Sequence, residues 1–132
     1  MAYLVSYLAC ALVMGMLDFL WLSNMLEAFY RPVLGPMLAE KPNMAAAFSF
    51  YILYLTGILI FAVVPALSSG NWWTASCYGA LFGLFAFATY DLTNLATLKI
   101  WSVKISLIDI AWGTVLTSVT ASAGAYAGLR MP

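Results

Sequence analysis

Apolar residues dominate the chain in four long runs, at about residues 4–26, 45–67, 74–98 and 105–129. Each run is long enough for a helix that crosses a hydrocarbon core of about 30 Å at a rise of about 1.5 Å per residue. The runs do not alternate between apolar and polar residues and are too long for strands, which argues against a β-barrel. The pattern therefore predicts one domain over residues 1–132, an all-α, integral membrane four-helix bundle with antiparallel, up-and-down topology.

Composition supports membrane insertion. Hydrophobic residues make up 65% of the chain and charged residues only 8%, which leaves too little polar surface for a water-soluble domain of this size. Five Lys and Arg residues balance five Asp and Glu residues, so no basic patch favours nucleic-acid binding. Histidine is absent, and both cysteines, Cys10 and Cys77, fall inside predicted helices. We therefore expect no protein-ligated metal and no cofactor.

Basic residues are divided unequally between the two ends of the predicted bundle. The loops at residues 27–44 and 99–104 share one side, and the other side carries only Arg130 and the terminal amine. The basic residues of the first side are Arg31, Lys41, Lys99 and Lys104. By the positive-inside rule this side faces the cytoplasm, so both termini are predicted to lie outside it.

Three aspartates fall inside predicted helices, and the topology places them in the same half of the bilayer. Asp18, Asp91 and Asp109 lie at depths of roughly 12, 10 and 6 Å from the cytoplasmic ends of their helices. A carboxylate that faces lipid costs on the order of 3 kcal/mol at the bilayer centre. We therefore expect the three to face each other or a polar cavity, where clustered carboxylates cannot all ionise. Arg31 is the candidate counter-ion.

The stretch Y-D-L-T-N-L-A-T around Asp91 carries a polar arc on one face of its helix. Thr93, Asn94 and Thr97 belong to this arc at about 100° per residue. Such an arc is predicted to look into the bundle. The alternative is that the threonines bond their own backbone and that Asn94 only joins two helices.

A second pattern links the first and last helices. The segments L-D-F-L-W at 17–21 and I-D-I-A-W at 108–112 each place a tryptophan three residues after an aspartate, on the same helix face. The pairs suggest two similar walls of one pocket. Alternatively, Trp21 and Trp112 occupy the membrane interface that tryptophans favour.

Two further features concern how the helices pack and how the bundle closes. The loop F-Y-R-P-V-L-G-P-M-L-A-E-K-P-N carries apolar residues between prolines and predicts a short interfacial segment over the cytoplasmic mouth. A stripe of small residues on the last helix predicts close helix packing. Its members are Gly113, Thr117, Thr120 and Gly124.

The motifs Y-D-L-T-N-L-A-T-L-K-I-W, L-D-F-L-W and I-D-I-A-W together resemble a bacterial family of small four-helix membrane proteins of unknown function. The likeness covers essentially the whole chain. It implies a multi-pass protein of the bacterial inner membrane, and it supplies no activity. The positions that match the family's motifs, and that we take as candidate ligand-binding residues, are Asp18, Trp21, Asp91, Thr93, Asn94, Thr97, Asp109 and Trp112.

Three functions fit these features. In the first, the acidic site near the cytoplasmic side binds or transports a small cation, a proton or a polar ligand, and the chain pairs as a homodimer to complete a pathway. In the second, the chain is an accessory subunit of a larger membrane complex that docks through the small-residue face from Gly113 to Gly128. The third is an enzyme that modifies lipids or quinones, with carboxylates as acid and base. The absence of histidine ranks the enzyme last.

Overall fold

Every regular element of the protein is a helix, and together the helices form a four-helix bundle. The structure is a computed structural model that describes all of residues 1–132. Two long segments are single helices, α5 (Trp72–Thr97) and α6 (Val103–Leu129). The other two are interrupted by turns of different pitch. The first segment comprises α1 (Ala2–Met25), η1 (Leu26–Tyr30), α2 (Arg31–Leu34) and η2 (Gly35–Met37). The second segment comprises α3 (Met44–Ile58), η3 (Leu59–Val63) and α4 (Val64–Ser69). The predicted all-α bundle is confirmed.

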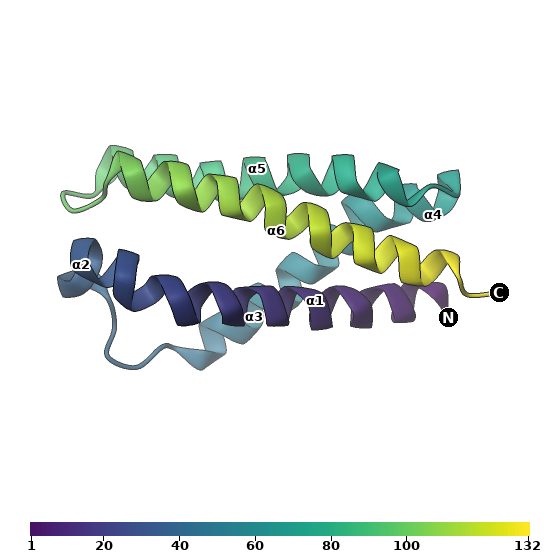
Figure 1. Cartoon of the computed structure of the whole chain (residues 1–132), viewed down its shortest axis with the longest axis horizontal. Helices are drawn as coiled ribbons and strands as arrows, with labels where there is room; N and C mark the ends of the chain where they lie inside the picture. The colour runs from purple at the N-terminus through teal and green to yellow at the C-terminus, as the bar shows by residue number, and fades with distance from the viewer.

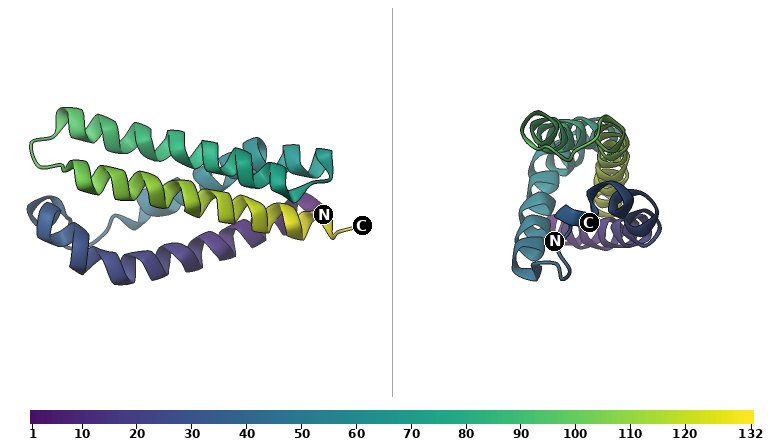
Figure 2. Two further views of the ribbon diagram at one scale, coloured as in Figure 1. Left: turned by 45° about the horizontal axis from the view of Figure 1, so that its top comes forward. Right: turned by 90° about the vertical axis from the view of Figure 1, so that its left-hand side faces the viewer.

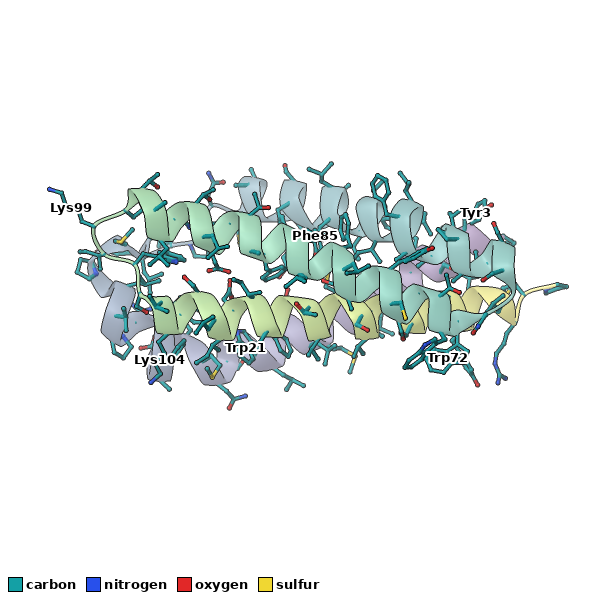
Figure 3. The ribbon with its side chains drawn as sticks, turned by 90° about the horizontal axis from the view of Figure 1, so that it is seen from above. Tyr3, Trp21, Trp72, Phe85, Lys99 and Lys104 are labelled. Atoms are coloured by element: carbon teal, nitrogen blue, oxygen red, sulfur yellow. The ribbon has the colours of Figure 1, made fainter.

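The four segments run alternately in opposite directions. Both termini and the turn between α4 and α5 lie at one end of the bundle, and α2 and the loop between α5 and α6 lie at the other (Figure 1). Viewed from the α2 end, the segments surround a common axis (Figure 2). Lys99 and Lys104 lie at the α2 end, whereas Tyr3 and Trp72 lie towards the opposite end (Figure 3). We call the first of these the basic end.

Three segments are long and apolar enough to cross a membrane, namely Ala2–Met37, Met44–Ser69 and Val103–Leu129. The remaining segment, α5, has 26 residues and lies alongside α6 (Figure 1). Its polar residues, Asp91 among them, lower its mean hydropathy. A bilayer is therefore the environment of the bundle.

Side-chain caps explain where three of the helices begin. The side chains of Asn43, Asn71 and Ser102 accept hydrogen bonds from the backbone N–H groups of the following turn, at the start of α3, α5 and α6. Such caps satisfy donors that a helix N-terminus leaves unpaired. The starts of these helices lie within two residues of the predicted ones.

The first predicted loop, residues 27–44, is mostly helical instead. The chain passes from α1 through one π-helical turn into α2 and η2, so that only a short link up to Asn43 remains before α3. The second π-helical turn, η3, lies just before Pro65, which occupies the first turn of α4. Pro65 has no N–H to donate, so a change of pitch before it is the expected response.

Glycines bring α5 and α6 into close contact. A Cβ atom added to Gly79 would meet Ala121, and one added to Gly83 would meet the carbonyl oxygen of Gly113. Gly113 itself lies against the ring of Phe87. The predicted close packing of the last helix is thereby explained, because small residues allow the two backbones to approach.

The same helix packs against α1 further along. Gly124 lies against Cys10, and Gly128 lies against Ser6. Gly113, Gly124 and Gly128 are all buried within the single chain. The expectation that the face from Gly113 to Gly128 is a free docking surface for a partner is therefore wrong, since α1 and α5 already cover it.

A pair of glycine substitutions tests this packing. Gly83→Ala should lower the free energy of unfolding by about 1 to 3 kcal/mol, because its Cβ would meet the Gly113 carbonyl oxygen in the α6 backbone. Gly15→Ala is the matched control, since nothing lies within 4 Å of its Cβ position. The measurement is thermal unfolding of both variants in the same detergent. Equal melting temperatures for the two would contradict the packing described here.

Candidate functional site

A cavity of about 790 Å³ lies within the basic end of the bundle. Ligand pockets usually measure about 300 to 1,000 Å³. Fifteen of the eighteen residues that line it are hydrophobic. The aromatic members of the wall are Trp21, Tyr30, Phe50, Tyr54, Phe87, Tyr90, Trp101 and Trp112. The three remaining residues are Asp18, Asn94 and Asp109, so two carboxyl groups stand in an otherwise apolar and aromatic chamber.

Asp18, on α1, accepts hydrogen bonds from two other segments. The hydroxyl of Tyr51 on α3 donates to Oδ2 at 2.7 Å. The indole Nε1–H of Trp112 on α6 donates to Oδ1 at 3.4 Å. Asp18 therefore connects three of the four segments at the level of the cavity.

Asp109, on α6, accepts a hydrogen bond from the segment that contains α1 and η1. The hydroxyl of Tyr30 in η1 donates to its Oδ1 at 2.8 Å. The same hydroxyl accepts the indole N–H of Trp21 at 3.2 Å. Trp21 is thus linked to Asp109 through the Tyr30 hydroxyl, whereas Trp112 binds Asp18 directly.

The two tryptophans also contact each other. The rings of Trp21 and Trp112 are stacked, with centroids 4.3 Å apart and planes inclined by 6°. The two Asp-x-x-Trp motifs therefore meet in one site. The tryptophan of each motif is hydrogen-bonded to the aspartate of the other, directly for Trp112 and through the Tyr30 hydroxyl for Trp21. Figure 3 shows Trp21 in the half of the bundle that carries Lys99 and Lys104.

Asp91 lies next to the cavity rather than on its wall. Its side chain is 0% exposed, and neither carboxyl oxygen has a hydrogen-bond partner. Asp109 is near enough to act on it electrostatically. The adjacent Tyr90 and Asn94 do reach the cavity.

Thr93 and Thr97 are placed elsewhere. Both are exposed on the outer face of α5. The Thr97 hydroxyl donates to the backbone carbonyl of Thr93 at 2.8 Å, and that of Thr93 to the carbonyl of Thr89. The expectation of an inward polar arc is therefore wrong for these two threonines. Their hydroxyls are satisfied by their own helix, so they can face lipid without cost.

Sequence reasoning missed the two tyrosines that bind the aspartates. Tyr30 and Tyr51 lie in different segments, and no spacing relates them to Asp18 or Asp109. Tyr54, which lines the cavity, shares a 2.7 Å hydrogen bond with the hydroxyl of Thr117 and binds neither aspartate. The available signal was general: a buried carboxylate needs hydrogen-bond donors, and a tyrosine hydroxyl is one of the donors that this chain offers.

The segment from η1 to η2 covers the cavity at the basic end, as the apolar loop residues predicted. Leu34 is 4% exposed, and it lines the cavity with Met37 and Leu38. Arg31, however, does not reach any of the aspartates. Its Nε forms a 2.8 Å ion pair with Glu27 one turn earlier, on the exposed surface. Arg31 as counter-ion is therefore wrong, because it pairs with Glu27 and does not line the chamber.

No lysine or arginine lines the cavity. Lys104 lies over the ring of Phe29, 5.6 Å from its centroid. The only ion pair in the chain is the one between Arg31 and Glu27. The carboxyl groups of the site therefore receive neutral hydroxyl and indole donors and no positive charge.

Comparison with known proteins agrees with the fold. The model of a family described as "Predicted membrane protein (DUF2177)" matches residues 3–126, nearly the whole chain. No curated protein and no solved structure matches this chain significantly.

The hydrogen bonds of Tyr30 can be tested by removing one oxygen atom. Tyr30→Phe loses the donor to Asp109 and the acceptor for Trp21, and should lower the free energy of unfolding by about 1 to 2 kcal/mol. Tyr78→Phe is the matched control, because Tyr78 is exposed on the lipid-facing side of α5. Thermal unfolding in detergent measures both. A Tyr30→Phe protein as stable as Tyr78→Phe would show that the link between Trp21 and Asp109 does not form.

Proposed function

We propose that this chain, which belongs to the family of predicted membrane proteins described above, binds a small organic cation between Asp18 and Asp109. The observation that carries the proposal is the charge balance of the cavity. Two carboxyl groups face an apolar chamber that contains no lysine or arginine. A carboxylate in such a place needs either a proton or a positive charge beside it, and a bound cation supplies the charge.

The wall of the cavity favours an organic cation over a hydrated metal ion. Aromatic faces attract cations and also cover apolar surface. The chamber presents the stacked Trp21 and Trp112, with Tyr30, Tyr54 and Tyr90 nearby. Its lining is too apolar to replace the oxygen ligands that a hard metal ion needs. A cationic centre on an apolar body matches both features.

The volume and position of the cavity suggest transport or sensing. About 790 Å³ is enough for a ligand of drug-like size. The basic residues gathered at this end support a cytoplasmic placement by the positive-inside rule, with both termini outside, in a bacterial inner membrane. The ligand would then enter from the cytoplasmic side or from the adjacent leaflet.

Tetraphenylphosphonium is a suitable probe because it is a permanent cation with four apolar rings. We expect it to raise the melting temperature of the purified full-length protein and to bind saturably. Tetraphenylborate has the same shape and the opposite charge, so it should do neither. The comparison separates binding in the site from partition into detergent.

Removing one carboxylate should weaken the binding selectively. Asp18→Asn should reduce affinity for tetraphenylphosphonium at least about tenfold, because the attraction between unit charges 4 Å apart is about 4 kcal/mol at an effective dielectric of about 20, and tenfold needs only about 1.4 kcal/mol. Glu40→Gln removes an exposed carboxylate that does not line the cavity and should leave affinity unchanged. Equal binding of both ions, or equal affinity of both variants, would contradict the proposal.

A further inference from the structure

Asp91 is a buried carboxyl group that the cation site does not use. It is absent from the cavity wall, its side chain is 0% exposed, and both of its oxygens lack a hydrogen-bond partner. Asp18 and Asp109, by contrast, accept hydrogen bonds from tyrosine and tryptophan. An ionised carboxylate with no donor is among the costliest groups that an apolar interior can contain.

The groups that face Asp91 offer no compensation for a negative charge. From α6 it faces Asp109, which is itself acidic. Tyr30 of η1 and Tyr90 of α5 are near enough to feel its charge. The Tyr30 hydroxyl hydrogen is already donated to Asp109. Neither α1 nor α3 supplies a basic group, because neither contains any lysine or arginine.

Two adjacent carboxyl groups in such surroundings are most stable when they share one proton. The shared state carries one negative charge instead of two, and it removes the need for a donor to the second carboxyl group. The Tyr30 hydroxyl donates a hydrogen bond to Asp109 at 2.8 Å, whereas Asp91 accepts none. Asp91 is then the member that holds the proton.

We propose that Asp91 and Asp109 hold one proton between them and that this proton leaves when an organic cation binds in the cavity. The inference rests on the proposed function. The O–H bond of the carboxylic acid breaks, its electron pair stays on the carboxylate, and the proton passes by way of Asp109 to water at the cavity mouth. The cation brings in one positive charge as the proton removes one. The net charge of the site is therefore conserved, and the two species compete.

Asp109 provides the physical link between the two sites. It lines the cavity, whereas Asp91 lies behind it. A cation beside Asp109 stabilises the ionised form of both carboxyl groups, so it favours loss of their proton. By linkage, a shared proton must weaken cation binding to the same degree.

Isothermal titration calorimetry of the full-length protein with tetraphenylphosphonium tests the exchange, because this ion has no proton to lose. Measurements at one pH in buffers of different ionisation enthalpy give the number of protons released. We expect about one proton per bound cation, and a dissociation constant that falls about tenfold per pH unit while the pair remains protonated. Asp91→Asn should release none and bind with an affinity independent of pH, since it removes the buried acid that holds the proton.

Two controls keep the result decisive. Glu40→Gln should release the same proton as the unmodified protein. Difference infrared spectra with and without the cation should show loss of a protonated carboxyl band, and Asp91→Asn should lack this band. Binding to the unmodified protein without proton release would overturn the exchange and leave the proposed function standing. Failure of the unmodified protein to bind the cation at all would overturn both.

Discussion

A carboxyl group inside a membrane must be compensated, and this bundle contains three of them at one end. Two are compensated by neutral donors from other segments: Tyr51 and Trp112 serve Asp18, and Tyr30 serves Asp109. Each of these hydrogen bonds crosses between segments, so the aspartates also hold the bundle together. Asp91 has no donor, and in the function proposed above it is the uncompensated carboxyl groups that bind a proton or a cation.

The packing of α6 is what allows the three groups to lie at one level. Its small residues let α5 approach on one side and α1 on the other, through Gly83 and Gly113 in the first contact and Gly124 in the second. With both neighbours close, the tryptophans of α1 and α6 stack at 4.3 Å and connect the two aspartates. The chain from η1 to η2 then closes the chamber and contributes Tyr30. Close helix packing and site geometry are therefore consequences of the same small residues.

Hydrophobic run length was enough to predict the four segments, because each run matches the thickness of a bilayer and polar residues cap three of the helix starts. The common level of Asp18, Asp91 and Asp109 followed from topology alone. The individual contacts did not follow. Tyr30 and Tyr51 are remote in sequence from the aspartates that they bind. Thr93 and Arg31 have hydrogen-bond partners within their own segment, a backbone carbonyl for Thr93 and Glu27 for Arg31, so neither side chain needs to turn into the bundle. Periodicity shows which face is polar, but it does not show which hydroxyl is already paired with its own helix.

The most direct test of a cation site between two membrane carboxylates is the position of a cation in the protein. Tetraphenylarsonium has the shape and charge of the phosphonium ion, and its arsenic atom scatters X-rays anomalously. Crystals of the protein grown with this ion should give one anomalous peak inside the chamber bounded by Asp18, Asp109 and the Trp21–Trp112 stack, and crystals of Asp18→Asn should give a weaker one. A peak found only on the lipid-facing surface, with the chamber closed by its own side chains, would contradict the site.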